Sequence, residues 1–243
     1  MGVYAVFWRE MIILKRRLWR VLASYTVSPL LFLIAFGWGM GRSLHVEGVA
    51  YLTFMIPGLI ALSSMSQSFS ISMDINISRF YWMTFEEFQS APISSFSVVL
   101  GEVLSGIVKG VLASLIILLL ALGFGVKLGI NGGFLLSLLL NTFMFASAAV
   151  ITSMIVKSHA DQASFNGFFI LPMSFLCGTF FPLSRLPEWA YFIAQVLPLT
   201  HASACIRAAA LGRDFPLFSL AIMVVYSALF FSVAVISVRR ASI

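Results

Sequence analysis

Long apolar runs are the feature of this sequence that most restricts its fold. Six stretches are close to or longer than the ~20 apolar residues that a helix needs to cross a bilayer. They cover residues 21–40, 51–73, 96–124, 134–156, 165–181 and 217–238. Helices satisfy their own backbone groups in lipid, and these runs are too long for barrel strands. The sequence therefore predicts an all-α, multi-pass membrane protein with six transmembrane helices in a single domain over residues 1–243.

The composition supports a lipid environment. Hydrophobic residues make up 60% of the chain and charged residues only 10%, whereas soluble domains carry about 25% charged residues. The net charge of +6 could suit nucleic acid. The cations cluster beside the apolar runs, however, as cytoplasmic anchoring charges do. We therefore expect a lipid membrane and no nucleic acid as the surroundings of this chain.

The distribution of Lys and Arg predicts the orientation. With six spans both termini lie on one side of the membrane. Nine cations fall on that side and five on the other, with Lys109 inside the third run. The nine are Arg9, Lys15, Arg16, Arg17, Arg20, Arg79, Lys157, Arg239 and Arg240, and the five are Arg42, Lys127, Arg185, Arg207 and Arg213. The excess predicts that both termini are cytoplasmic, in a cytoplasmic (inner) membrane.

Residues 1–20 precede the first run and have their own pattern. Apolar and aromatic residues recur at helical spacing, and basic residues fill the intervening positions. This pattern predicts an amphipathic helix along an anionic cytoplasmic leaflet. The alternative is a set of topogenic charges with no further role.

Residues 78–92 (SRFYWMTFEEFQSAP) interrupt the apolar runs between the second and third spans. At 100° per residue the aromatic and acidic side chains separate onto opposite arcs. The aromatic arc holds Tyr81, Trp82, Phe85 and Phe88, and the acidic arc holds Glu86, Glu87 and Ser90. The segment is predicted to be a cytoplasmic helix with its aromatic face against the membrane or a partner. A solvated connector is the alternative.

Residues 182–216 follow the fifth run and carry charges and prolines that a full span would bury at high cost. We expect one or two short re-entrant helices here, at the outer edge of the membrane. Their candidate residues are Pro182, Arg185, Pro198, His201 and Arg207.

Polar residues also occur inside the apolar runs. Glu102 and Lys109 are seven apart on the third span and share one face. Anchoring at the interface, with Lys109 snorkelling, competes with a role in substrate or proton movement. A second group, Ser63, Ser66, Gln67 and Ser70, lies on the second span. Hydrogen bonding between helices competes with a translocation path for these four residues.

Motifs for chemistry are missing from the sequence. No Gly-Lys pair occurs, so the chain has no P-loop. Cys177 and Cys205 form no metal pattern, although a single bridge between them stays open. The three histidines are far apart, without a HExxH or Gly-x-Ser-x-Gly motif. We expect no catalytic site and no metal, which disfavours an intramembrane enzyme. A stand-alone carrier or channel remains an alternative, although no internal repeat supports it.

Three stretches resemble the ABC-2 family of ATP-binding-cassette transporter permeases, which includes exporters of drugs, polysaccharides and nodulation lipo-oligosaccharides. They are FEEFQSAPIS at 85–94, FLCGTFFPLSRLPEW at 175–189, and LPLTH at 197–201 followed by Arg207. With the span layout, the resemblance extends over nearly the whole chain. Cys177 departs from it, because a small residue such as Ser is expected there.

The resemblance implies a transport function that is shared between this chain and a separate ATPase subunit. It implies that 78–92 contains a coupling helix that contacts a separate ATPase subunit through Phe85, Glu86, Glu87, Phe88 and Gln89. It implies that ATP and Mg are bound by that subunit and that this chain holds no cofactor. It also implies a homodimer, or a pair with a similar permease, that exports a lipid-like, glycan or drug-like substrate.

Overall fold

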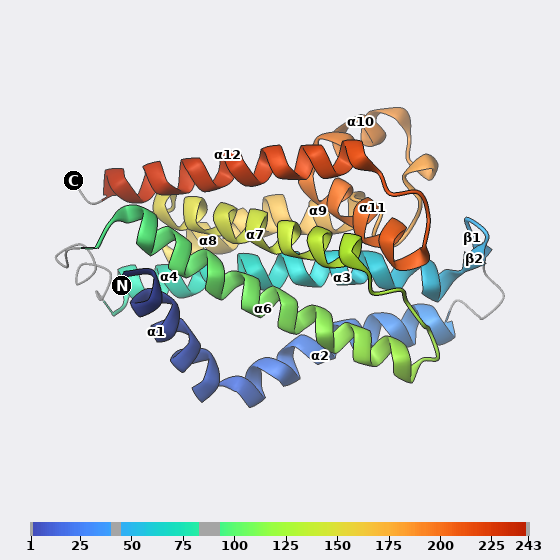
Figure 1. Ribbon diagram of the computed structural model, residues 1–243, viewed down its shortest axis with the longest axis horizontal. Helices are drawn as coiled ribbons and strands as arrows, with labels where there is room; N and C mark the ends of the chain where they lie inside the picture. Colours follow the sequence, from blue (N-terminus) through green and yellow to red (C-terminus); the bar gives the residue numbers. More distant parts are fainter. Residues whose placement is uncertain (1, 40–44, 83–92, 242–243) are drawn as a thin grey trace.

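The computed structural model describes residues 2–39, 45–82 and 93–241, and nearly all of these residues are helical (Figure 1). The first half consists of α1 (Gly2–Arg16), α2 (Leu18–Ile34), a π-helical turn (Ala35–Gly39), β1 (His45–Val46), β2 (Val49–Ala50), α3 (Tyr51–Phe69), α4 (Ile71–Phe80) and α6 (Ser95–Gly123). The second half consists of α7 (Gly132–Ile155), α8 (His159–Phe165), a π-helical turn (Asn166–Ile170), α9 (Leu171–Leu176), a 3₁₀ turn (Leu183–Arg185), α10 (Glu188–Val196), α11 (Pro198–Leu211) and α12 (Leu217–Ala241).

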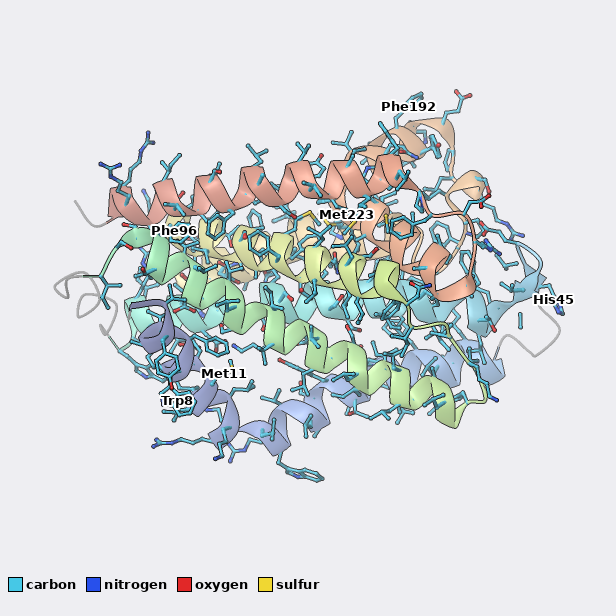
Figure 2. All side chains as sticks on the ribbon, in the orientation of Figure 1. Trp8, Met11, His45, Phe96, Phe192 and Met223 are labelled. Atoms are coloured by element: carbon cyan, nitrogen blue, oxygen red, sulfur yellow. The ribbon has the colours of Figure 1, made fainter. Side chains whose placement is uncertain are left out.

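The long helices run along a common axis, and the two ends of this bundle differ (Figure 1). The start of α1 and the end of α12 lie at one end, beside α4 and the start of α6. The antiparallel β1–β2 hairpin lies at the opposite end, near α10 and α11. Labelled side chains mark the same polarity, with Trp8 and Phe96 at the terminal end and His45 at the hairpin end (Figure 2). Both termini therefore lie at the same end of the bundle.

Five helices of the described ranges are long and apolar enough to cross a membrane: Leu18–Gly37, Tyr51–Phe80, Ser95–Gly123, Gly132–Ile155 and Leu217–Arg240. They match five of the six predicted runs. The remaining run, 165–181, is divided among α8, a π-helical turn and α9, and its helix ends at Leu176. A sixth full span therefore remains a prediction.

The helix through the second run is longer than the sequence pattern suggested. We expected it to end near Met73, but α4 continues through Phe80, so the first three residues of the segment 78–92 belong to it. Polar side chains of α4 find partners inside the protein. Asn76 donates to Gln162 Oε1 at 3.0 Å, and Arg79 donates to the carbonyl oxygen of Ser153. Because these groups are paired, the helix need not end where the polar residues begin.

Helix α3 is the centre of the bundle and packs against α6, α7 and α11, whereas α2 and α12 are mostly exposed. Two glycines of α6 allow the close packing. A Cβ on Gly106 would lie 2.6 Å from the Cβ of Ala146, and one on Gly110 would overlap Ser68 of α3. The Gly-xxx-Gly spacing of 106–110 therefore serves contacts within one chain.

Shorter helices lie near the start of the chain (α1) and in its last third (α10 and α11). Helix α1 packs along α6 and buries Val6, Glu10 and Leu14. Tyr4 and Trp8 stay exposed on its other face and stack at 5.8 Å between ring centroids. Helices α10 and α11 occupy the predicted re-entrant region, and α10 exposes Trp189 and Phe192. An exposed aromatic face suits a membrane–water boundary in both places.

Candidate functional site

A groove follows α2, α3 and α9 along the bundle and consists of three hollows. The aromatic hollow has about 370 Å³ and is lined by Phe32, Phe36, His45, Val46, Tyr51, Phe175, Phe180, Phe181, Pro182 and Arg185. The serine hollow has about 250 Å³ and is lined mainly by α2, α3 and α9. The charged hollow has about 240 Å³ and lies between α1, α2, α3, α4 and α6. Phe32, Phe175 and Phe180 line both of the first two hollows, and Tyr25 and Gln67 line both of the last two.

The serine-rich face of α3 divides into two sets. Ser63, Ser66 and Gln67 line the serine hollow, and Gln67 and Ser70 line the charged hollow. All four are half-buried, and the structure brings these predicted path residues together on one wall of the groove. Exposing polar side chains to lipid costs free energy, unless water, substrate or another chain contacts them.

The second set of α3 serines faces the protein interior. Ser64 accepts a hydrogen bond from Asn141 Nδ2 at 2.8 Å, and Ser68 Oγ donates to the carbonyl oxygen of Gly106 at 3.0 Å. Both serines are fully buried. Hydrogen bonding between helices is thus the role of Ser64 and Ser68, and a translocation path along the other four residues stays a prediction.

The aromatic hollow lies at the hairpin end and is apolar apart from its edge. Tyr51 donates its hydroxyl to the carbonyl oxygen of Phe180 at 2.9 Å, so its ring is held at the wall. Phe180 also contacts Phe32, Phe36 and Phe175 at ring-centroid distances of 5.1, 5.7 and 5.8 Å. Pro182 and Arg185, predicted as outer residues, line this same hollow. Arg185 gives the edge a positive charge beside a surface that favours rings and chains.

Charged side chains meet at the other end of the groove. Lys109 Nζ lies 2.6 Å from Asp74 Oδ2, so its ammonium group is paired with a carboxylate of α4. Arg9 Nη2 contacts Glu10 Oε1 at 2.6 Å and Glu102 Oε1 at 3.1 Å. Glu102 is buried and lies outside the hollow, where it joins α6 to α1. Sequence reasoning missed Asp74, although a search for a partner of Lys109 would have found a carboxylate in the neighbouring run.

The remaining outer residues hold the fold together behind the groove. Arg207 donates to the carbonyl oxygens of Gly178 at 2.6 Å and Phe54 at 3.2 Å, and its guanidinium lies 4.1 Å from the Phe54 ring centroid. His201 Nε2 lies 2.9 Å from the Gln195 carbonyl oxygen, which fixes Nε2 as the donor. Its Nδ1 then accepts from Ser219 Oγ at 3.2 Å.

Pro198 is a further outer residue, and it begins α11. Neither His201 nor Arg207 lines the groove.

Other predicted features lie elsewhere. Phe85, Glu86, Glu87, Phe88 and Gln89 lie outside the described residues. Cys177 and Cys205 are both buried free thiols, so the bridge left open by the sequence is not formed. No group of three His, Cys, Asp or Glu side chains among the described residues could hold a metal ion.

A multi-pass helical membrane protein with a groove that is charged at one end, polar in the middle and aromatic at the other has the form of a membrane transport protein. Comparison with known proteins identifies the class more closely. The sequence profile described as ABC-2 type transporter matches residues 1–211, and the chain belongs to this family.

Similar proteins extend along most of the chain. Nodulation protein J of Sinorhizobium fredii (strain NBRC 101917 / NGR234) is 28% identical over 76% of this chain and 72% of its own length. Nodulation protein J of Rhizobium meliloti (strain 1021) is 29% identical over the same shares. The inner membrane transport permease YadH of Escherichia coli (strain K12) is 23% identical over 96% of this chain and 93% of its own length.

Proposed function

We propose that this chain is the permease subunit of an ATP-driven exporter in the inner membrane, and that the α2–α3–α9 groove is one wall of its translocation path. Membership of the ABC-2 type transporter family supports the transport role. The observation that carries the assignment of the path is the half-buried row Ser63, Ser66, Gln67 and Ser70 along the groove. A wall of this kind gains from a hydrated or substrate-filled space beside it.

A second copy of this chain, or a similar permease, completes the path in this proposal. The polar wall lies at the side of the bundle next to α2, which is mostly exposed. Ser66 and Ser70 donate to the carbonyl oxygens of Leu62 and Gln67 in their own helix, but the side-chain amide of Gln67 would face lipid at a cost if nothing covered this wall. A facing copy would enclose the groove and leave water or substrate in contact with the serines.

Energy comes from a separate subunit in this proposal. The chain has no P-loop, so ATP and Mg would be bound by a partner that docks on the segment with Glu86 and Glu87. Both termini and the beginning of α6 lie at the same end of the bundle, which would then be the cytoplasmic end.

The groove also indicates the kind of cargo. Its aromatic hollow is bounded by Arg185, and its middle carries hydroxyl and amide groups. A groove with an aromatic part beside a polar part suits a molecule that has both apolar and polar groups. Lipid-like, glycan-bearing and drug-like substrates fit this description better than a small ion.

The test is to purify the tagged chain gently from its native membrane and identify its associated proteins by mass spectrometry. We expect an ATP-binding subunit with a P-loop in about equal amount. An intact dimer that never carries such a subunit would overturn the proposal and favour a stand-alone carrier or channel.

A further inference from the structure

The charged hollow has a lining that the transport proposal does not explain. Two carboxylates, Glu10 and Asp74, and two cations, Arg17 and Lys109, contribute to its wall. The formal charge of these four side chains adds up to zero. Tyr25, Gln67 and Ser70 add neutral polar groups, and Ile13, Leu14, Val21 and Met73 add apolar surface. The hollow of about 240 Å³ therefore offers both signs of charge to a small polar group.

The charges in this hollow are only partly used by the protein. Asp74 binds Lys109 through Oδ2, and Glu10 binds Arg9 through Oε1. The other oxygen of each carboxylate accepts no hydrogen bond from a described residue, and Arg17 forms no ion pair within the described ranges. As far as the described residues show, two acceptor oxygens and one guanidinium around the same space are therefore available to a ligand.

The position of the hollow matches the headgroup level of a membrane. It lies at the junction of α1 and α2, where Lys15, Arg16, Arg17, Trp19 and Arg20 are all exposed. Basic residues and Trp concentrate at the membrane–water interface, where anionic phosphates attract the basic groups.

The hollow also continues toward the membrane interior. Through Tyr25 and Gln67 it adjoins the serine hollow, whose wall includes Leu59, Leu62 and Phe175. A molecule with its polar group in the charged hollow therefore has an apolar surface beside it, along which a chain can extend.

We propose that the charged hollow binds the zwitterionic headgroup of a phospholipid of the phosphoethanolamine type. The phosphate lies toward Arg17, and the ammonium group donates to the free oxygens of Asp74 and Glu10. An anionic headgroup would bring no donor for the second oxygens of Asp74 and Glu10, and a simple cation would bring no anionic group for Arg17. A primary ammonium also supplies N–H donors for charge-assisted hydrogen bonds, which a trimethylated amine lacks.

This inference goes beyond the proposed transport function, because it assigns a lipid-binding site. Binding to that site can be measured on this chain alone. Purified protein in detergent is titrated with phosphatidylethanolamine and with phosphatidylglycerol of the same acyl chains, and bound lipid is counted by native mass spectrometry. The variants are Arg17→Gln and, as the matched control, Arg16→Gln. Both residues are exposed at the same junction, but only Arg17 lines the hollow.

We expect the wild-type chain to prefer phosphatidylethanolamine. Arg17→Gln should weaken that binding about tenfold, as the loss of one charged hydrogen bond does, and Arg16→Gln should leave it unchanged. Equal binding of the two lipids, or equal effects of the two substitutions, would overturn the proposal. Because the partner ATPase is not needed, failure here is distinct from failure of the permease assignment.

A second arm separates two sources of the same headgroup. The chain and its associated subunits are reconstituted in vesicles that contain an acyl-labelled phosphatidylethanolamine, and the label is followed between leaflets. Movement that depends on ATP identifies the bound lipid as cargo. Binding without such movement identifies a resident lipid held at the junction of α1 and α2.

Discussion

Lys109 and Asp74 form a pair whose two members differ in their access to water, and this decides which one is harder to replace. The Lys109 side chain is 9% exposed and that of Asp74 is 44% exposed. Asp74→Asn leaves a buried ammonium without its countercharge, which costs about 3 kcal/mol. Lys109→Met leaves a carboxylate that water can still reach, so we expect a loss of about 1 kcal/mol. Thermal unfolding in detergent measures both losses.

The double variant Asp74→Leu with Lys109→Met is the control for this pair. It removes both charges, and replacement of a buried pair by apolar residues is often neutral. We expect the double variant to unfold at a higher temperature than Asp74→Asn. A larger loss for Lys109→Met than for Asp74→Asn would show that Asp74 is the more poorly solvated member.

Ser66 provides a residue-level test of the groove. Its side chain lines the serine hollow and is half-buried. Ser66→Cys should react with a membrane-impermeant maleimide when the assembled transporter is in its native membrane, because a hydrated path lets the thiol ionise. Cys177 and Cys205 are fully buried and should give a low background.

Leu229→Cys is the matched control for this labelling. Leu229 is exposed near the middle of α12, a mainly apolar helix that does not line the groove. In lipid its thiol stays protonated and the reagent cannot reach it. Equal labelling of the two cysteines would mean that the groove is no wetter than the lipid-facing surface.

At the level of elements, the attachment of α1 to α6 depends on one glycine. A Cβ at Gly101 would lie 2.7 Å from the Cβ of Val6, so the two helices approach too closely for any larger residue. Gly101→Ala should lower the stability by about 1–3 kcal/mol, as overpacked contacts do. Adding Val6→Gly removes the Cβ and Cγ1 atoms that would lie 2.7 and 2.8 Å from the new Cβ, so it should recover part of the loss, less the cost of about 1 kcal/mol for a glycine inside a helix. The unfolding temperature of the three proteins measures this effect.

Gly123→Ala is the control in the same helix. Nothing lies within 4 Å of a Cβ at Gly123, the last residue of α6. The same chemical change should therefore leave the unfolding temperature nearly unaltered. If Gly101→Ala behaved like Gly123→Ala, α1 would be held to α6 by the Arg9–Glu102 ion pair rather than by close packing.

The helices also differ in how closely the sequence predicted their bounds. Uninterrupted apolar runs predicted α6, α7 and α12 to within a few residues. The length needed to cross the bilayer and the need to satisfy backbone hydrogen bonds in lipid can both be read from the local sequence. The run 165–181 is not found as one long apolar helix in the described part of the chain, so a sixth span stays a prediction. The run contains Pro172 and divides into short helical pieces, one with π geometry, and no hydropathy average can detect such a division.

Partners across the bundle were harder to predict than spans. Ser63, Ser66, Gln67 and Ser70 lie on one wall because helical spacing places them together, and their role as a path stays a prediction. Sequence reasoning found no partner for Lys109, because Asp74 is 35 positions away and α4 had to be recognised as a continuation of the helix. Periodicity describes the face of one helix, whereas packing decides what that face meets.

At the scale of the whole molecule, the proposed function requires the groove to respond to events at a distant ATPase. The segment with Glu86 and Glu87 leads directly into α6, and α6 contacts α1, α2, α3, α7 and α12. A displacement at the start of α6 would therefore reach the helices on both sides of the groove. Its Glu102 and Lys109 join it to α1 and α4 by ion pairs, which favours movement of these helices as one body.

The double variant Glu86→Lys with Glu87→Lys tests this arrangement. If these carboxylates face basic groups of the ATPase, reversing both charges replaces attraction by repulsion, and like-charge contacts at an interface cost several kcal/mol. We expect the amount of ATPase that co-purifies with the chain to fall at least about tenfold, with membrane insertion unchanged. Glu188→Lys, at the first turn of α10 near the hairpin end, is the control for added positive charge and should keep the ATPase bound. Full co-purification by the double variant would place the ATPase contact elsewhere, and α1 and the end of α12 would be the next surfaces to test.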